Sequence, residues 1–384
     1  MKKLTTEIYD LAFGGDGVGK IDGKICFVRG ALPGEEVVFD VVKETASFVK
    51  GELSDIKTVS PDRTDPLCKY YYQCGGCQLQ HIGYAKEVAY KKKQFEELFA
   101  RVGSFKGFKL DEVISSKDHY NYRSHITLHK AGDKYGFYAR DERSIMEIAS
   151  CSIAEEPING ALPCAARADD KDRLTIKADH AGRLWFSNKM GERFFPDTYA
   201  GKEMMFSPLA FSQANRHIST EMARVLGEWI GEEKKDTVFF DIFSGMGFFS
   251  FLLAPGFNKT IGADNDRVAI SAAKTTAKEK GYSGMKFYIL DAENEMERLY
   301  DSEKGPKNIA LIDPPRKGLS AEFVEWLSFA EGLNEIYYIS CDPARMARDI
   351  KAMTQGTTWR IGRSAMFDMF PRTKHIEALV SLRK

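Results

Sequence analysis

The second half of the chain alternates short apolar runs with longer amphipathic segments, a pattern that predicts parallel β-strands connected by α-helices. The runs predicted as strands are 237–242, 260–263, 285–290, 308–312, 335–339, 358–366 and 376–382. No helical pattern separates the last two of these seven runs, so we expect the final strand to insert antiparallel to its neighbours. The prediction is an α/β domain with a Rossmann-like, seven-stranded sheet.

The beginning of the chain has a different pattern. Residues 1–58 contain short strand-like runs separated by glycine-containing turns, among them Asp22-Gly23 and Pro33-Gly34. Several short strands at this spacing predict a small β-barrel of the oligonucleotide-binding kind. Barrels of this size bind RNA in some proteins and are inert packing modules in others, so the barrel alone leaves RNA binding open.

Between the barrel and the α/β domain, the pattern predicts one helix followed by strands. Residues 84–102 carry apolar positions at helical spacing, and we expect Lys91, Lys92 and Lys93 to lie on the solvent side of this helix. Short strand-like runs and turns return from residue 110 to residue 205 and predict a β-rich central region. The resulting division of the chain is 1–58, 59–205 and 206–384.

Composition and charge add little to this picture. The 384-residue chain is 43% hydrophobic and 29% charged with zero formal net charge, which is typical of a globular protein of two or three domains. No apolar run approaches the ~20 residues of a membrane-spanning helix, and the N-terminus lacks the apolar core of a signal peptide. We expect a cytoplasmic protein that does not associate with membranes, and a monomer. From Tyr84 to Lys130, ten Lys or Arg residues stand against six Asp or Glu residues, a bias that solvated helix faces commonly show.

Three of the seven cysteines, Cys68, Cys74 and Cys77, are clustered with the spacing C-x5-C-x2-C. Clustered cysteines in a reduced, cytosolic protein are typical of metal ligands rather than of disulfides. Zinc sites usually have two CxxC pairs and this segment has one, so the spacing favours an iron–sulfur cluster, with zinc as the alternative. A distant fourth cysteine would complete either site, and the candidates are Cys26, Cys151 and Cys164.

The first strand of the α/β domain runs into a glycine-rich turn, Phe243-Ser244-Gly245-Met246-Gly247, where the backbone could approach a ligand closely. A dinucleotide-binding turn would have a further glycine three residues later, which this sequence lacks. Asp264 follows the second strand, where it could accept hydrogen bonds from two ribose hydroxyls, and Asp291 follows the third, where it could bind an adenine amino group. Carboxylates at successive strand ends without a pyrophosphate site indicate an adenosine pocket, and S-adenosylmethionine is the cofactor we expect.

Residues suited to covalent catalysis follow the later strands. Asp313-Pro314-Pro315-Arg316 follows the fourth strand, where enzymes that methylate amines carry a Pro-Pro-aromatic sequence that stacks on a planar amine. Cys341 follows the fifth strand, at the sheet edge where open α/β proteins carry their chemistry, although a cysteine in such a place is often a small core residue. Glu377 begins the last strand. A thiol, a carboxylate and a methyl donor together suggest methylation of a weakly nucleophilic carbon.

These residues resemble the RNA (uracil-5-)-methyltransferases, specifically the branch with an N-terminal TRAM domain and a 4Fe-4S cluster that methylates 23S ribosomal RNA. The resemblance extends along essentially the whole chain and rests on the cysteine spacing and on five further motifs. These motifs are Phe211-Ser212-Gln213-Ala214-Asn215, Asp241 to Gly247, Asp313 to Arg316, Ser340-Cys341-Asp342-Pro343 and Asp368 to Glu377.

The resemblance implies a class I S-adenosylmethionine methyltransferase fold and a set of site residues. It implies that Cys341 is the nucleophile and Glu377 the base, and that Cys151 is the fourth cluster ligand beside Cys68, Cys74 and Cys77. The positions that match the cofactor and uracil pocket are Gln213, Phe243, Asp264 and Asp313. It also implies that 23S rRNA is the partner, bound by the TRAM barrel and the Lys-rich segment, and that a uridine becomes 5-methyluridine.

The sequence departs from the family pattern at four positions, and two rival functions stay open. Asp342, Phe248, Ser244 and Asp264 stand where the family usually has Asn, Asn, Cys and Glu. Asp342 would disfavour a thiolate beside it, so we expect its side chain to point away from Cys341. One rival function is the same reaction on transfer RNA, and the other is a non-catalytic RNA-binding or ribosome-assembly factor on the same scaffold.

Overall fold

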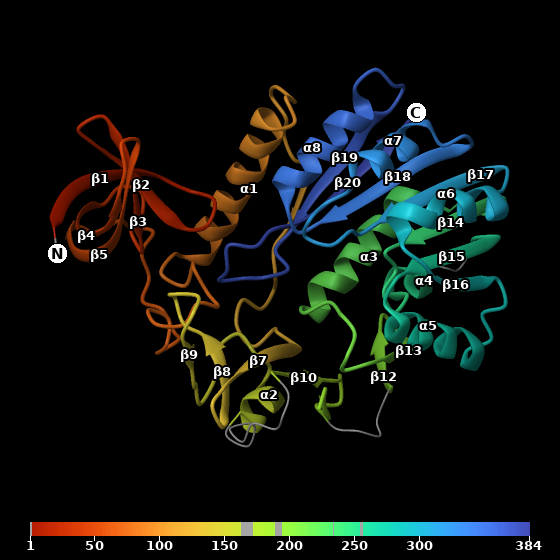
Figure 1. The fold of residues 1–384 in the computed structure, drawn as a ribbon, viewed down its shortest axis with the longest axis horizontal. Coiled ribbons are helices and arrows are strands. Elements are labelled where there is room, and N and C mark those ends of the chain that lie inside the picture. Colours follow the sequence, from red (N-terminus) through yellow and green to blue (C-terminus); the bar gives the residue numbers. More distant parts are fainter. Residues whose placement is uncertain (1, 163–171, 189–193, 233, 254–255) are drawn as a thin grey trace.

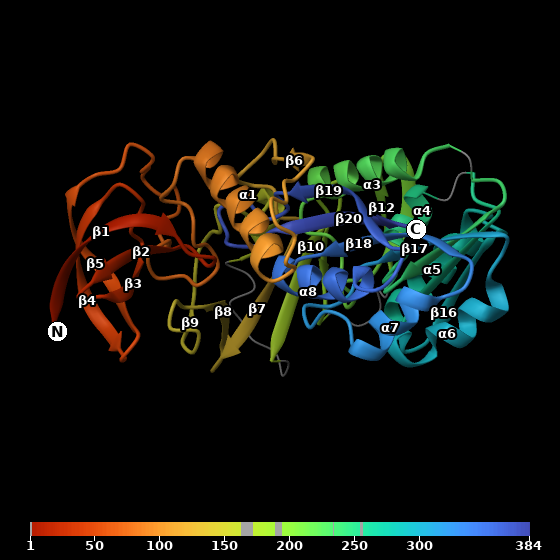
Figure 2. The same ribbon diagram turned by 90° about the horizontal axis from the view of Figure 1, so that it is seen from above.

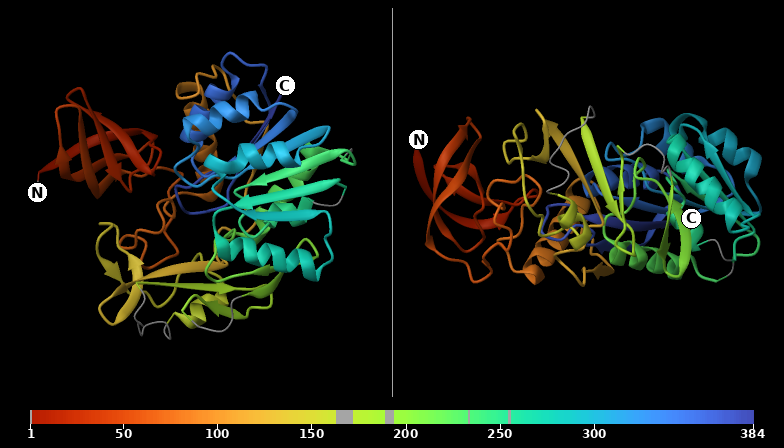
Figure 3. Two further views of the ribbon diagram at one scale, coloured as in Figure 1. Left: turned by 45° about the vertical axis from the view of Figure 1, so that its right-hand side comes forward. Right: turned by 90° about the horizontal axis from the view of Figure 1, so that it is seen from below.

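The structure, a computed structural model, describes residues 2–162, 172–188, 194–232, 234–253 and 256–384. It confirms the predicted fold class, with an N-terminal β-barrel, a β-rich central region and a C-terminal α/β domain (Figure 1). The barrel lies at one end of the molecule and is joined to the rest through residues 59–83 (Figure 3).

The N-terminal barrel closes in the strand order β1-β2-β3-β5-β4. Its strands are β1 (Lys3–Leu11), β2 (Asp16–Ile21), β3 (Lys24–Arg29), β4 (Glu36–Glu44) and β5 (Phe48–Thr58). Val28, Val37 and Phe39 are fully buried inside it. Closure pairs both edges of the sheet, so these strands present no open edge to other chains.

The central region is built mainly from antiparallel strands. One sheet has the order β11-β10-β7-β8-β9, and β12 pairs with β13 as a separate hairpin. The strands are β7 (His125–Ala131), β8 (Lys134–Tyr138), β9 (Ile145–Met146), β10 (Arg173–Ala178), β11 (Leu184–Phe186), β12 (Phe195–Tyr199) and β13 (Lys202–Phe206), with helix α2 (Glu156–Ala161) packed on β10. The prediction of a β-rich region is therefore confirmed.

The C-terminal sheet has the order β16-β15-β14-β17-β18-β20-β19-β6 among the described residues. Its members are β6 (Glu112–Ile114), β14 (Thr237–Ile242), β15 (Lys259–Asp264), β16 (Met285–Ile289), β17 (Lys307–Ile312), β18 (Leu333–Ser340), β19 (Arg360–Phe367) and β20 (Glu377–Arg383). All seven predicted strands are present, and β20 is antiparallel to both β18 and β19 as expected. The edge strand β6, which comes from the central region and runs parallel to β19, was not predicted.

Helices cover both faces of this sheet, as Figure 2 shows. They are α3 (Arg216–Ile230), α4 (Phe248–Leu253), α5 (Arg267–Glu279), α6 (Ala292–Glu303), α7 (Ala321–Phe329) and α8 (Pro343–Thr354). Strand β18 shows why both faces are apolar: Ile336 and Tyr338 belong to the core under α6, α7 and α8, while Tyr337 and Ile339 face α3. Alternate residues of a strand point to opposite faces, so a strand covered on both sides is apolar throughout.

The helix predicted at 84–102 is α1 (Tyr84–Arg101), and it packs against α8. The expectation that Lys91 faces solvent is wrong, because Lys91 is 1% exposed. Its Nζ lies 2.8 Å from Glu87 and 2.7 Å from Asp368, and these two carboxylates neutralise the buried ammonium. Lys92 and Lys93 are on the outer side as expected, where they pair with Glu96 and Asp10. The division of the chain at residues 58 and 205 stays a prediction.

In the part of the chain that the structure describes, no helix combines the length and the apolar character needed to cross a membrane.

Candidate active site

A pocket of about 530 Å³ lies at the carboxyl ends of the parallel strands. Open α/β sheets bind their ligands at this edge, and the volume suits a ligand of nucleoside size. The pocket wall includes every residue predicted for catalysis or cofactor binding, namely Gln213, Phe243, Asp264, Asp291, Asp313, Cys341 and Glu377. Residues distant in sequence therefore converge on one cavity.

The pairing of β18 with β20 brings Cys341 and Glu377 together. Ser340 at the end of β18 is opposite Ala378 near the start of β20. Cys341 comes one residue after Ser340, and Glu377 comes one residue before Ala378. Because the strands are antiparallel, both residues lie at the same edge of the sheet. A thiol and a carboxylate therefore face one pocket from neighbouring strands.

The side chain of Asp342 points away from this pair, as expected. Its Oδ1 accepts hydrogen bonds from the backbone N–H groups of Ala344 and Arg345, both at 3.1 Å, and so caps the first turn of α8. This is the usual role of Asp at an N-cap position. The carboxyl groups that raise the pKa of Cys341 are those of Glu377 and, to a smaller extent, Asp313, not that of its sequence neighbour.

Burial and neighbouring carboxylates raise the pKa values of both reacting groups in the free pocket and so disfavour their ionised forms. Burial and then the nearby Glu377 raise the pKa of Cys341 to about 11, although Arg316 opposes this shift. Burial also raises the pKa of Glu377 well above its ordinary value, with Asp313 adding to the effect and Arg316 again opposing it. A positive charge in the pocket would lower both pKa values and favour the ionised forms.

Further carboxyl groups lie at the ends of the neighbouring strands. The pKa of Asp313 is raised to about 8, first by burial and then by the charges of Asp241 and Asp264. Asp241 lies beneath the pocket and accepts hydrogen bonds from the backbone N–H and hydroxyl of Ser250, while its burial raises the pKa to about 6. Such a concentration of buried carboxyl groups selects for a cationic ligand, because a cation relieves their mutual repulsion.

The turn after β14 positions Asp264. Phe243 has φ = +65° and Gly245 has φ = +53°, which are left-handed conformations that only glycine adopts without strain. This turn aims the N–H of Gly245 at Asp264 Oδ2, 2.9 Å away, while Asp264 Oδ1 accepts from the N–H of Asp266 at 2.8 Å. Asp264 is thus fixed at the pocket wall. Asp291 also lines the pocket and caps α6 by accepting from the N–H of Glu293.

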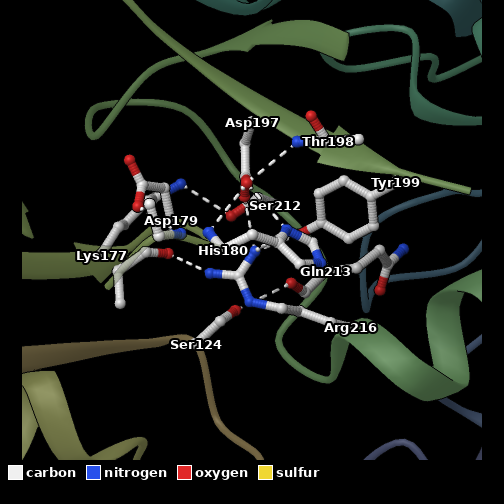
Figure 4. A network of polar contacts seen from close by, with 12 residues as sticks. Ser124, Lys177, Asp179, His180, Asp197, Thr198, Tyr199, Ser212, Gln213 and Arg216 are labelled. Carbon is white, nitrogen blue, oxygen red and sulfur yellow. Dashed lines mark hydrogen bonds and ion pairs between the residues drawn. The ribbon is translucent and has the colours of Figure 1, made fainter. Parts of the chain in front are cut away.

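Phe211 and Gln213 reach the pocket from the junction with the central region. The polar network around Gln213 includes the buried Lys177 and the partly buried Arg216 (Figure 4). Lys177 of β10 donates to the carbonyl of Ala210 at 2.6 Å and to the hydroxyl of Ser212 at 2.8 Å. Its burial lowers the pKa to about 7. Arg216, at the start of α3, pairs with Asp197 and Glu155. The contacts of Lys177 thus hold the residues that precede Gln213, which itself belongs to neither a strand nor a helix.

Two further residues of the pocket wall, Arg316 and Phe370, lie within motifs recognised in the sequence, but no role had been predicted for them. Both residues follow strands that end at the pocket, so their positions in the sequence could have indicated that they line it. Phe248, in contrast, packs edge-on against Tyr199 and Phe249 in the apolar core and does not line the pocket. At this position, a side chain that packs against other aromatic rings therefore replaces the asparagine that the family usually has.

The four cysteines Cys68, Cys74, Cys77 and Cys151 line a second cavity, of about 260 Å³. Apolar side chains, including Ile126, Phe137 and Ile148, form much of the rest of its wall. Burial raises the pKa of Cys77 to about 12. The N–H of Gly76 lies 3.4 Å from Cys74 Sγ and donates to it. Among the described residues, no three His, Cys, Asp or Glu side chains form a set that could hold a metal ion as they stand.

The other two candidates for a fourth ligand have different outcomes. Cys26 is fully buried in the core of the β-barrel, so it does not reach the cavity. Cys164 lies outside the described residues. Cys151 is the distant cysteine that lines the cavity with the clustered three, and its backbone N–H donates to Asn159 Oδ1 at 2.8 Å.

The fold and the pocket define a class I S-adenosylmethionine-dependent methyltransferase. The whole chain has the fold of the Pyrococcus abyssi tRNA (uracil-54, C5)-methyltransferase, whose structure contains S-adenosyl-L-homocysteine, with a TM-score of 0.75 and 20% identity over 99% of this chain and 100% of that one. Residues 198–384 match the tRNA (Uracil-5-)-methyltransferase family, and residues 2–54 match the TRAM domain. The C-terminal α/β domain is therefore similar to the RNA (uracil-5-)-methyltransferase family, and the N-terminal barrel matches a TRAM domain.

Relatives in this family include proteins with and without an assigned substrate. The 23S rRNA (uracil(1939)-C(5))-methyltransferase RlmD of Aeromonas salmonicida is 28% identical over 94% of this chain and 92% of its own length. An uncharacterized RNA methyltransferase of Aquifex aeolicus is also 28% identical, over 99% of this chain and 98% of its own length. The activity of the family is methylation of uracil carbon 5 in RNA with S-adenosylmethionine as the donor.

The raised pKa of Asp313 predicts that the pocket binds a cation more tightly as the pH rises. Asp313 is protonated below its pKa of about 8, and it must lose this proton to interact favourably with a sulfonium. We expect the affinity for S-adenosylmethionine to rise by up to about tenfold per pH unit towards pH 8 and to level off above it.

Calorimetry can check this dependence against S-adenosylhomocysteine, a matched ligand that has a neutral thioether in place of the sulfonium. Its affinity should change less with pH, and Asp313→Asn should bring the two ligands' pH dependences together. Equal pH dependence of the two ligands in the parent protein would contradict the assignment.

Proposed function

We propose that this protein methylates carbon 5 of a uridine in 23S rRNA, with Cys341 as the nucleophile and Glu377 as the base. The observation that carries the proposal is the convergence of the two groups from β18 and β20 on a pocket lined by Gln213, Phe243, Asp264, Asp291 and Asp313. Neither group has an evident structural role. Cys341 lines the pocket instead of the core, and Glu377 is a buried carboxyl that forms no ion pair within the part of the chain that the structure describes.

The first step needs the Cys341 thiolate. Carbon 5 of uracil is a poor nucleophile, and addition of the Cys341 sulfur to carbon 6 converts it into an enolate carbon. The pKa of about 11 means that thiolate formation must be assisted, and Arg316 lowers that pKa. The amino end of α8, which begins at Pro343, is nearby and favours negative charge as well.

The last step needs Glu377. After methylation, carbon 5 still carries its proton, and the carbon 6–sulfur bond still holds the base to Cys341. Glu377 removes that proton, the electron pair forms the carbon 5–carbon 6 double bond, and the sulfur leaves as the thiolate. The nucleophile is regenerated and the product is 5-methyluridine.

The cofactor residues supply complementary charge and orientation. S-adenosylmethionine, when bound, supplies a methyl group on a positively charged sulfonium. Asp264 would accept hydrogen bonds from the ribose hydroxyls, Asp291 would bind the adenine amino group, and Phe243 and Gln213 would contact the cofactor and the uracil. The buried carboxyl groups of Asp313 and Glu377 fit a cationic cofactor because they are costly to ionise without one.

The uridine must leave its stack to reach Cys341, which implies base flipping from single-stranded or loop RNA. The TRAM barrel would hold the surrounding RNA. The Lys-rich segment of α1 is a poorer candidate than the sequence suggested, because Lys91 is buried and Lys92 and Lys93 are already paired with carboxylates.

Cys68, Cys74, Cys77 and Cys151 would hold a 4Fe-4S cluster. The donor set fits the group: four thiols from two chain segments face one cavity of about 260 Å³ with a largely apolar wall, and the N–H of Gly76 donates to a sulfur. Such a cluster, when bound, would tie the 68–77 loop to the central region at Cys151. Its role in the proposal is structural.

The choice of 23S rRNA is supported by full-length relatives such as the enzyme from Aeromonas salmonicida. The tRNA enzyme of Pyrococcus abyssi shares the fold at 20% identity, which supports no choice of substrate. A non-catalytic assembly factor is disfavoured because such a factor would not need to keep both reacting groups in the pocket.

Glu377→Gln is expected to slow turnover by about two to four orders of magnitude, because the amide cannot accept the carbon 5 proton. Addition and methyl transfer should proceed and release should stall. A methylated protein–RNA adduct should therefore be visible on denaturing electrophoresis and be absent from the double variant Cys341→Ala/Glu377→Gln. Near-parent turnover without an adduct would exclude Glu377 as the base.

Anaerobically purified protein is expected to contain about four irons per chain. Cys151→Ser should lose most of this iron and the brown colour, whereas Cys26→Ser, in the barrel core, should keep both. Metal analysis checks both variants. Stoichiometric zinc without iron in the parent protein would show that the four cysteines form a zinc site and not an iron–sulfur cluster.

Cells that lack the protein are expected to lose 5-methyluridine at one or more positions of 23S rRNA and to keep that of transfer RNA. Mass-spectrometric mapping of both RNAs checks this outcome. Re-expression of the parent protein should restore the modification, and Cys341→Ala should not. Loss of 5-methyluridine from transfer RNA alone would assign the enzyme to the rival substrate.

A further inference from the structure

The segment from Asp368 to Ile376, which joins β19 to β20, carries Phe370 of the pocket wall and leads directly into Glu377. It is called the base loop below. It is neither helix nor strand, and Arg372 within it has φ = +68°, an unfavourable conformation for a residue other than glycine. Such a conformation persists only where the surroundings hold it. The contacts that hold the base loop therefore set the position of the proposed base.

Helix α1 supplies one group of these contacts. Lys91 donates to Asp368 at 2.7 Å and to the carbonyl of Phe370 at 3.2 Å. Glu87 accepts from the backbone N–H of Arg372 at 2.7 Å and also pairs with Lys91. Lys91, Glu87, Asp368 and Arg372 are all at most 5% exposed, and they balance two positive charges with two negative ones.

The loop that carries Cys68, Cys74 and Cys77, called the cysteine loop below, supplies a second group of contacts. These contacts are centred on Gln78, the residue after Cys77. The backbone N–H groups of Gln78 and Leu79 donate to the carbonyl of Arg372 at 3.1 and 3.0 Å. The Gln78 side chain connects the two loops: its Oε1 accepts from the N–H of Lys374 at 3.2 Å, and its Nε2 donates to the carbonyl of Gly75 at 2.8 Å. Gly75 lies between Cys74 and Cys77.

We propose that Gln78 is a positioning residue, which transmits the conformation of the cysteine loop to the base loop and so sets the place of Glu377. This inference rests on the proposed role of Glu377. Two of its contacts fix backbone atoms of the base loop, and Lys374 is three residues before the proposed base. On this proposal, the cysteine site serves the proton-removal step without taking part in it.

The buried charges support a positioning role more than a stabilising one. Burying four charged groups costs solvation that their attraction regains only in part, so apolar residues would stabilise the same place equally well. Polar contacts have directions, and they fix the loop in one conformation where apolar packing would tolerate several.

The test compares two rates in Gln78→Leu, which keeps the approximate size of the side chain and removes both of its hydrogen bonds. The first rate is adduct formation on RNA that contains 5-fluorouridine, whose fluorine cannot leave as the proton does, so the reaction stops before Glu377 acts. The second is release of 5-methyluridine product from ordinary RNA in a single turnover. Gln73→Leu is the matched control, because Gln73 lies in the same loop with an exposed side chain.

We expect Gln78→Leu to lower the ratio of the release rate to the adduct rate by ten- to a hundredfold, the loss that follows from displacing a catalytic group by about 1 Å. Gln73→Leu should leave the ratio unchanged. Partial unfolding lowers both rates on the same preparation and leaves their ratio unaltered, so an unchanged ratio in Gln78→Leu overturns the proposal. Failure of the parent protein to form a Cys341-dependent adduct would instead contradict the proposed function.

Hydrogen exchange gives a second readout that does not depend on activity. Amides of residues 369–376 should exchange at least about tenfold faster in Gln78→Leu than in the parent protein, while those of β20 and of the N-terminal barrel stay protected. Equal exchange of the base loop in the two proteins would also overturn the proposal.

Discussion

The antiparallel direction of β20 is the constraint on which the proposed chemistry depends. The parallel strands place their carboxyl ends, and Cys341 with them, at one edge of the sheet. Because β20 runs the other way, its first residue, Glu377, lies at that same edge. A parallel strand of the same seven residues would carry Glu377 to the opposite edge, about 20 Å away. The short base loop, which has no helix, is what permits the reversal.

Several carboxyl groups lie close together at this edge of the sheet, and their ionisation depends on the charge of the ligand in the pocket. Burial raises the pKa values of Asp313, Asp241 and Glu377, so ionisation of these groups is disfavoured while no positive charge lies beside them. The cationic cofactor supplies that charge when it binds. On the proposed mechanism, a bound sulfonium would favour the ionised form of Glu377 before methyl transfer, because a nearby positive charge lowers the pKa of a carboxyl group.

The sequence predicted the fold and the pocket well because both follow from local patterns. Apolar runs identified all seven strands of the α/β domain, and polar residues at their ends identified the pocket wall. The choice of Cys151 among three cysteines came from the family resemblance, since spacing could not distinguish it. Its position on the cavity wall depends on the folding of the central region, which places β7, β8 and the 148–153 segment around the cysteine loop.

The errors concern contacts between distant parts of the chain. Within α1, a run of three lysines suggests a solvated face, and helical periodicity cannot show which one is buried. Lys91 is buried because Asp368, 277 residues later, lies over it. Strand β6 was missed for a similar reason. Its three residues are too few to show a hydrophobic periodicity, and they form a strand by pairing with β19.

Both missed contacts end on the chain segments around β19, and this connects them to function. Strand β6 pairs with the end of β19, and Lys91 binds the base loop that follows it. The catalytic sheet is thus completed, and its base loop held, by residues that precede the catalytic domain in sequence. An isolated 206–384 domain would keep Cys341, Asp264 and Asp313 on its own strands, but it would lack the groups that hold Phe370 and Glu377. On the proposed mechanism, the central region therefore supplies the contacts that give the proposed base a single position.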